Sequence, residues 1–208
     1  MPRAVLLDLD RTLVDVQSHT DYDAAWADVR ASHPELVPDE GPETGWTSAT
    51  RACMGTLAAL PDGALWHEVS DAVAVHERAA IPLSVTMPGA AQFVPALSGR
   101  PVAVVTLLPE DVARDVLRHH GLAIDVVVGR DPRVRPKPAG DGLLHALRQL
   151  GAAAGTAVMV GDSTWDAAAA RDAGVGFVGV HAGRVEFARD FPDVPVVETL
   201  ADVLVRIS

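Results

Sequence analysis

The sequence is poor in several kinds of residue and segment, and each scarcity excludes a class of protein. It has one cysteine, Cys53, in 208 residues, which rules out an internal disulfide and fits a reducing compartment. The net charge is −11, and no cluster of lysine and arginine offsets it, which argues against a nucleic-acid partner. No apolar run reaches the length of a membrane span, and no signal-like apolar segment follows the Met-Pro-Arg start. We expect a soluble cytoplasmic protein with no nucleic-acid or membrane partner.

Lysine is almost absent. Lys137 stands against sixteen arginines, and the chain has no asparagine. Arginine therefore occupies nearly every position where any positive charge suffices. Arginine is a planar fork and lysine a compact charge on a flexible stem, so a site that needs the second cannot use the first. We expect Lys137 to be functional.

Most of the chain has the pattern of an α/β domain. The opening apolar run, Ala4 to Leu7, has no polar alternation, which predicts a strand buried on both faces. From Pro88 onward, short apolar strands alternate with helical patterns, which predicts βαβ units and a parallel sheet. The further predicted strands are 101–106, 124–128, 156–160, 176–180 and 194–197, and the helices are 89–98, 110–120, 141–150, 164–173 and 200–207.

Residues 16–87 have a different character. They show no strand pattern, but three helical patterns, at 21–33, 44–60 and 64–81, and they hold three of the four tryptophans. The predicted fold is therefore a Rossmann-like parallel sheet, formed by residues 1–15 and 88–208, with a small all-helical cap of residues 16–87 inserted after the first strand. We expect this cap to cover the tip of that strand.

Polar side chains gather at the predicted strand ends. They are Asp8, Asp10, Thr106, Lys137, Asp162 and Asp166. Ligands of parallel sheets bind beyond the carboxyl ends of the strands, so we expect these groups to converge. Carboxylates held close together repel one another unless a cation or a proton lies between them. Oxygen ligands suit Mg²⁺, and no Cys/His cluster points to zinc.

Each of these residues also has a plain structural interpretation. The two aspartates after the first strand can belong to a solvated turn, and Thr106 can be an ordinary strand threonine. Asp162 can be a helix N-cap. Asp166 can be a first-turn residue favoured by the helix dipole.

Taken together, these stretches resemble the four motifs of the haloacid dehalogenase (HAD) superfamily, in the family's order. Residues 8–13, Asp-Leu-Asp-Arg-Thr-Leu, are similar to the first motif, usually DxDGT. Thr106 resembles the second motif, Lys137 the third, and residues 161–166, Gly-Asp-Ser-Thr-Trp-Asp, the fourth. The helical insert resembles the C1-type cap of phosphoglycolate-phosphatase-like members. Two departures stand out: Arg11 replaces the usual glycine, and Leu107 stands where asparagine is frequent.

The resemblance implies roles for these residues. Asp8 would be the nucleophile that forms an aspartyl-phosphate, and Asp10 the acid and base that serves the leaving oxygen and then water. Thr106 and Lys137 would bind the phosphoryl oxygens.

A Mg²⁺ cofactor is also implied. Asp8, the main-chain carbonyl of Asp10, and Asp162 would hold the ion, with Asp166 as a ligand or as a neighbour of the ligands. Substrate contacts are expected from the cap, its hinges and nearby loops: Arg11, Gln17, His19, Tyr22, Trp26, Arg30, Trp46, Arg51, Trp165 and His181.

The implied activity is a Mg²⁺-dependent phosphatase acting on a small phosphorylated metabolite, as a monomer or homodimer. A phosphomutase of the same fold and a catalytically silent phosphate-binding module remain open alternatives, the second because of Arg11 and Leu107. A dehalogenase is disfavoured because Asp10 supplies an acid/base that carbon–halogen cleavage does without. A response-regulator receiver fits poorly, because its acidic pair and its phosphorylated aspartate lie on different strands and it has no cap.

Overall fold

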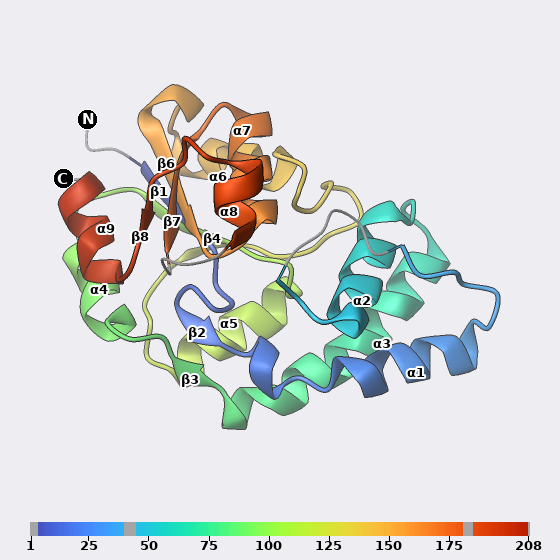
Figure 1. The fold of residues 1–208 in the computed structure, drawn as a ribbon. Coiled ribbons are helices and arrows are strands. Elements are labelled where there is room, and N and C mark those ends of the chain that lie inside the picture. The colour runs from blue at the N-terminus through green and yellow to red at the C-terminus, as the bar shows by residue number, and fades with distance from the viewer. Residues whose placement is uncertain (1–3, 40–44, 181–184, 208) are drawn as a thin grey trace.

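The sheet confirms the predicted α/β fold. The computed structural model describes residues 4–39, 45–180 and 185–207. Six strands form one parallel sheet in the order β5-β4-β1-β6-β7-β8 (Figure 1). Strands β4 and β5 lie on one side of β1, and β6, β7 and β8 lie on the other. The strand order therefore reverses at β1, and the carboxyl end of the strand at such a reversal is the usual ligand position. The strands are β1 (Ala4–Leu7), β4 (Val102–Val105), β5 (Val126–Val128), β6 (Ala157–Gly161), β7 (Gly176–Val180) and β8 (Val196–Val197).

Helices cover both faces of this sheet. Val5 and Leu7 of β1 contribute to one hydrophobic cluster, and Ala4 and Leu6 contribute to another on the opposite face. This double burial explains the uninterrupted apolar run at the start of the chain. The first cluster is completed by α4 (Ala90–Ala96), α5 (Glu110–His119) and α9 (Leu200–Ile207), and the second by α6 (Asp141–Leu150) and α7 (Thr164–Ala173).

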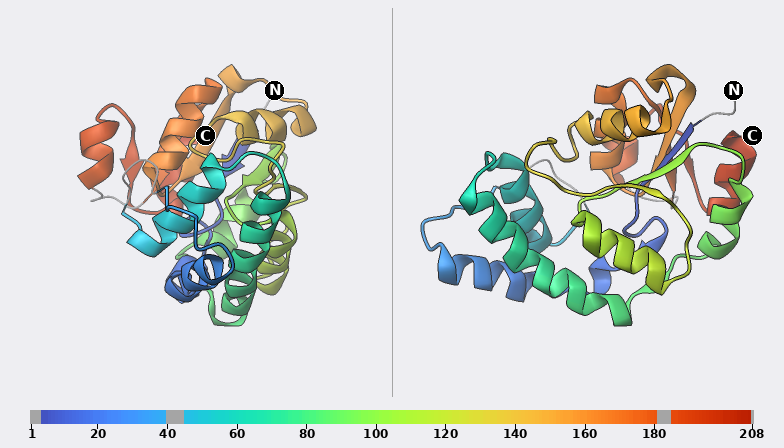
Figure 2. Two further views of the ribbon diagram at one scale, coloured as in Figure 1. Left: turned by 90° about the vertical axis from the view of Figure 1, so that its right-hand side faces the viewer. Right: turned by 180° about the vertical axis from the view of Figure 1, so that it is seen from behind.

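Apart from η3 (Ala154–Thr156), which precedes β6, and α8 (Val185–Asp190), the remaining helices pack on one another. They are η1 (Gln17–His19), α1 (Tyr22–Ser32), α2 (Ser48–Ala59), α3 (Ala64–Ala80) and η2 (Ile81–Leu83). We call α1–α3 the cap. Figures 1 and 2 show the cap as a helical layer beside the sheet domain. Its apolar core is separate from both clusters of the sheet and includes Trp66 and Cys53. Among the described helices, none is both long and apolar enough to cross a membrane.

Three details differ from the sequence prediction. Residues 16–87 do contain a strand, because β3 (Val85–Thr86) pairs antiparallel with β2 (Val14–Asp15). This pairing lies where the chain enters and leaves the cap. A strand of two residues is too short to show an alternating pattern, so the sequence carries no signal for it. Helix α2 begins later than residue 44, because the Thr47 side chain accepts a hydrogen bond from the Thr50 N–H and caps the helix there. Helix α8 (Val185–Asp190) is too short to give a periodic signal.

The thiol of Cys53 offers a direct test of the cap's packing. Cys53 is buried, and burial, followed by the negative charge of Glu77, raises the pKa of its thiol to about 12. Because the thiolate is the reactive form, we expect iodoacetamide to label the folded protein roughly 10³-fold more slowly than the denatured chain at mildly alkaline pH. Mass spectrometry measures this, with Cys53→Ala as the blank. Rapid stoichiometric labelling of the folded protein would contradict this packing.

Candidate active site

The turn after β1 places the first two aspartates. The Asp8 N–H donates to the Val160 carbonyl at 2.9 Å and so extends the pairing of β1 with β6. The chain then turns back, and the Arg11 N–H donates to the Val14 carbonyl at 2.7 Å. Arg11 has φ = 59°, in the left-handed region that disfavours side chains. The turn thus keeps a conformation that suits glycine, although arginine occupies the position.

Asp10 is anchored to the segment that leads into the cap. Its Oδ1 accepts hydrogen bonds from the N–H groups of Val16 and Gln17, each at 2.9 Å. Burial, and to a smaller extent the charge of Asp162, raises the pKa of Asp10 to about 7, although these two hydrogen bonds lower it. A carboxyl with a pKa near neutrality can both give and take a proton, as an acid/base catalyst must.

The lone lysine lies among the carboxylates. Lys137 Nζ donates to Asp8 Oδ1 at 2.6 Å and to Asp166 Oδ1 at 2.7 Å, and all three side chains are buried. Burial lowers the pKa of Lys137, but Asp166 and Asp8 outweigh this effect and raise the pKa above its usual value. Lys137 therefore carries a positive charge between two acidic side chains.

The start of α7 orients Asp166. Ser163 is the N-cap residue, and both its N–H and its hydroxyl donate to Asp166 Oδ2, at 3.1 and 2.6 Å. Ser163 Oγ accepts in turn from the Asp166 N–H, which completes a capping box. A Cβ at Gly161 would lie 2.6 Å from Asp166 Oδ2, so only glycine leaves room for this carboxylate. Asp162 is therefore not the cap of α7.

Thr106 lies directly after β4. Its N–H donates to the Val128 carbonyl at 2.9 Å, and its Oγ1 accepts from the Leu108 N–H at 3.2 Å. That second bond uses the hydroxyl as an acceptor, so the hydroxyl can still donate to a ligand. The predicted role of Thr106 in binding phosphoryl oxygens stays a prediction that this geometry allows.

Three carboxylates lie in the arrangement of a metal site. Oxygens of Asp8, Asp162 and Asp166 lie within 4.8 Å of one another, and all three residues are buried. Burial raises the pKa of Asp8 well above its usual value; Lys137 lowers it, and Asp166 and Asp162 raise it again. A divalent cation would offset this repulsion, and carboxylate oxygens are the ligands that Mg²⁺ prefers. The residues present fit a magnesium ion.

All six polar residues predicted from the strand ends face one small cavity. Its volume is about 30 Å³, and it lies between the sheet domain and the cap. The opposite wall comes from the cap and its entry segment: Gln17, Tyr22, Trp46, Thr50, Met54 and Glu77. The carboxylates on the sheet side of the cavity therefore suit a cation, and this cation together with Lys137 and Thr106 suits a phosphoryl group. The cap side offers a mixed polar and apolar wall to the rest of a ligand.

Comparison with known proteins identifies the family. A family model described as haloacid dehalogenase-like hydrolase matches residues 2–174. The chain belongs to this family. Membership confirms the resemblance seen in the motifs, and it makes this HAD-like protein a hydrolase.

Two curated relatives and one solved structure illustrate the similarity. The chain is 31% identical over 201 residues to the probable phosphatase IndB of Dickeya dadantii, covering 88% of this chain and 83% of the relative. It is 32% identical over 187 residues to a phosphoglycolate phosphatase of Rhodospirillum rubrum, covering 84% and 78%. A hydrolase from Pseudomonas syringae has the same fold, with a TM-score of 0.75, 21% identity and coverage of 98% and 97%.

Some substrate contacts expected in this HAD-like hydrolase do line the cavity, and others do not. Gln17, Tyr22 and Trp46 line it. His19 is exposed. Trp26 packs, partly buried, against the cap core.

The other expected contacts lie elsewhere. Arg11 lines an adjoining open hollow beside the cap's entry segment, which shares Gln17, Tyr22 and Thr50 with the cavity. Trp165 is buried, and its ring centroid lies 5.0 Å from that of Trp46. It joins α7 to the cap core instead of lining the cavity, although its sequence neighbours are acidic site residues. Arg30 is exposed, Arg51 does not line the cavity, and His181 lies outside the described residues.

The sequence analysis of this HAD-like hydrolase missed Glu77 in the cavity wall and its partner Arg130. A signal for Glu77 exists, because it follows Trp66, Ser70 and Val73 on the buried stripe of α3. A glutamate on such a stripe needs a polar partner. A lone arginine in a loop gives no comparable signal for Arg130.

Proposed function

We propose that this hydrolase is a Mg²⁺-dependent phosphatase that releases phosphate from a small phosphomonoester through an aspartyl-phosphate on Asp8. The observation that carries the proposal is the pairing of Asp8 with Lys137 at 2.6 Å, in a cavity that Asp10 also lines. This arrangement supplies a nucleophile, a cation and an acid/base to one ligand. The relatives named as phosphatases support it.

The chemistry follows from the positions of these groups. A carboxylate oxygen of Asp8 attacks phosphorus, the bond from phosphorus to the leaving oxygen breaks, and protonated Asp10 gives its proton to that oxygen. Water then attacks phosphorus, the bond from phosphorus to the Asp8 oxygen breaks and releases phosphate, and Asp10 takes a proton from the attacking water. Thr106 and Lys137 bind the phosphoryl oxygens during both steps.

Magnesium would be held by Asp8, Asp162, Asp166 and the carbonyl of Asp10. When bound, it neutralises charge on the phosphoryl group, which is a large part of catalysis in phosphoryl transfer.

The cap controls access in this proposal. The cavity volume of about 30 Å³ holds on the order of two water molecules, which is less than a phosphomonoester needs. Substrate entry therefore requires the cap wall of this cavity to move. Its return excludes bulk water and brings the cap wall against the leaving group.

Removal of the metal tests the proposal. We expect the purified protein to release phosphate from p-nitrophenyl phosphate and from members of a phosphometabolite panel. Chelation with EDTA should lower the rate by about 10²-fold or more, because the metal stabilises charge in the transition state. Excess Mg²⁺ should restore it, and circular dichroism should show that the chelated protein stays folded.

Each alternative predicts a different result. Turnover that EDTA leaves unchanged would exclude the metal-dependent mechanism. An absence of phosphate release across the whole panel would favour a silent phosphate-binding module, and conversion to an isomeric sugar phosphate without release would favour a mutase.

A further inference from the structure

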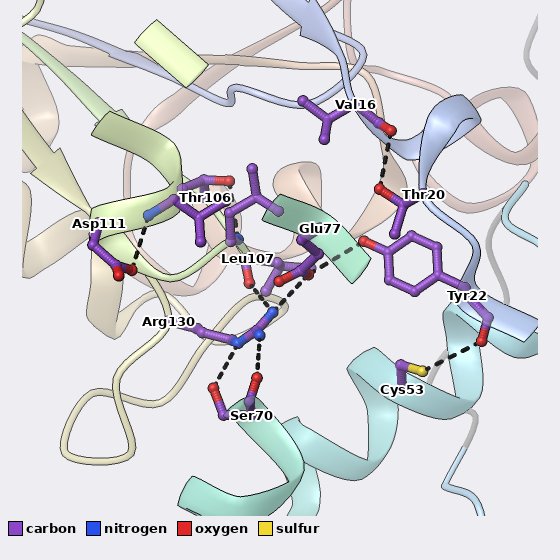
Figure 3. Close-up of polar contacts among 12 residues, drawn as sticks. Val16, Thr20, Tyr22, Cys53, Ser70, Glu77, Thr106, Leu107, Asp111 and Arg130 are labelled. Atoms are coloured by element: carbon purple, nitrogen blue, oxygen red, sulfur yellow. Dashed lines mark hydrogen bonds and ion pairs between the residues drawn. The ribbon is translucent and has the colours of Figure 1, made fainter. Parts of the chain in front are cut away.

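Glu77 is a buried carboxylate of the cap whose two oxygens have different surroundings. The residue is 0% exposed and lines the cavity. Its Oε1 accepts hydrogen bonds from Arg130 Nη1 at 2.7 Å and from the Tyr22 hydroxyl at 3.3 Å (Figure 3). Its Oε2 is also buried, yet it has no hydrogen-bond partner in the described part of the chain. Buried carboxylate oxygens are costly to leave unpaired, so this oxygen is suited to a ligand.

Arg130 holds Glu77 in place without reaching the second oxygen. The guanidinium also donates to Ser70 Oγ at 3.0 Å, to the Ser70 carbonyl at 2.9 Å and to the Leu107 carbonyl at 3.1 Å (Figure 3). These bonds join α3 of the cap to the loops after β4 and β5. A rigidly held carboxylate can select among ligands, because it cannot turn away from an unfavourable group.

None of the described cap residues that line the cavity carries a positive charge that could receive an acidic leaving group. Among the described residues that line the cavity, Lys137 is the only basic one, and it is bound to Asp8 and Asp166. A leaving-group carboxylate that approached the cap would meet the carboxylate of Glu77, whose ion-pair partner Arg130 is bound to Oε1 and does not line the cavity. A hydroxyl or an ammonium group would instead donate to Oε2.

We propose that Glu77 determines the leaving group of this enzyme: its Oε2 accepts a hydrogen bond from a hydroxyl or ammonium on a small phosphomonoester, and esters with a carboxylate there are rejected. This inference rests on the proposed phosphatase activity and names its substrate class. It separates this chain from its relative named phosphoglycolate phosphatase, because phosphoglycolate carries a carboxylate in that position.

A matched series of two-carbon phosphate esters tests the selection in the wild-type protein. Ethyl, hydroxyethyl and aminoethyl phosphate and phosphoglycolate differ only in the end group. We expect kcat/KM for the better of hydroxyethyl and aminoethyl phosphate to exceed that for ethyl phosphate by about tenfold or more, the effect of one hydrogen bond to a charged group. Phosphoglycolate should be the poorest of the four. The better of the two donor esters shows whether the natural group is a hydroxyl or an ammonium.

Glu77→Gln then assigns the effect to this side chain. Glutamine keeps the shape and one oxygen for Arg130, but it removes the charge. We expect the ratio of kcat/KM for the donor esters to kcat/KM for ethyl phosphate to fall about tenfold, chiefly because KM for the donor esters rises. The ratio of kcat/KM for phosphoglycolate to kcat/KM for ethyl phosphate should rise. Glu68→Gln is the matched control, since it makes the same substitution on α3 at an exposed residue that does not line the cavity. It should leave the ratios unchanged.

The outcomes separate this inference from the proposed function. If ethyl phosphate and p-nitrophenyl phosphate are hydrolysed but phosphoglycolate equals or exceeds both donor esters, the role of Glu77 is excluded and the phosphatase remains. If Glu68→Gln shifts the ratios as much as Glu77→Gln, the effect is not specific to the cavity and the assignment to Glu77 fails. Should Glu77→Gln fail to fold, the wild-type ratios still decide. If no phosphomonoester is hydrolysed, the proposed function fails first and this inference fails with it.

Discussion

Asp8→Asn is expected to abolish phosphate release while the protein stays folded. An amide has the shape of the carboxylate but cannot attack phosphorus, so we expect kcat to fall by about 10³-fold or more. Lys137 can still donate to the amide oxygen, as it does to Asp8 Oδ1. The substitution also removes the charge repulsion between Asp8 and the carboxylates of Asp162 and Asp166. The unfolding temperature in EDTA should therefore match or exceed that of the wild type.

The control for this variant is the same substitution nearby. Asp15 is half-buried, does not line the cavity, and accepts a hydrogen bond from the Ser18 N–H at 3.0 Å. Asp15→Asn should retain most of the activity. The measurements are phosphate release under saturating Mg²⁺ and thermal unfolding by circular dichroism. If Asp8→Asn turned over at the wild-type rate, an aspartyl-phosphate on Asp8 would be excluded.

Lys137→Met is expected to lower both stability and activity. Methionine fills similar space but leaves Asp8 and Asp166 buried without their cation. Removing one partner from a buried ion pair costs about 3–5 kcal/mol of the free energy of unfolding, measured by denaturant titration in EDTA. Loss of a positive charge beside the phosphoryl oxygens should lower kcat by about 10²–10³-fold.

Magnesium should partly replace the missing charge. The rise in unfolding temperature on adding Mg²⁺ should therefore be larger in Lys137→Met than in the wild type, because a ligand that binds only the folded state stabilises it. The control is Arg135→Met, since the Arg135 side chain is 73% exposed and pairs with Asp141 at 2.7 Å. Exposed ion pairs contribute little to stability, so this variant should stay close to the wild type. If the two variants had equal stability and equal activity, a role for Lys137 in catalysis and in stabilising the buried carboxylates would be excluded.

The sequence alone determined the sheet and the positions of the polar residues at its edge. The apolar run of β1 predicts burial on both faces, and the alternation of strands and helices predicts parallel pairing. Both are local patterns, so they can be interpreted without knowing which distant residues they contact. Because the carboxyl ends of parallel strands share one edge, the order of Asp8, Thr106 and Asp162 along the chain was enough to predict that they meet. The scarcity of lysine pointed to Lys137.

Only the tertiary structure decided what faces the substrate from the cap. Glu77 and Arg130 are 53 residues apart, and no local pattern pairs them. Trp165 stands between acidic site residues in the sequence, yet it packs on Trp46, because residues at the start of a helix point in different directions. How the cap packs on the sheet domain depends on long-range contacts between surfaces, and no spacing along the chain specifies which side chains those surfaces bring together.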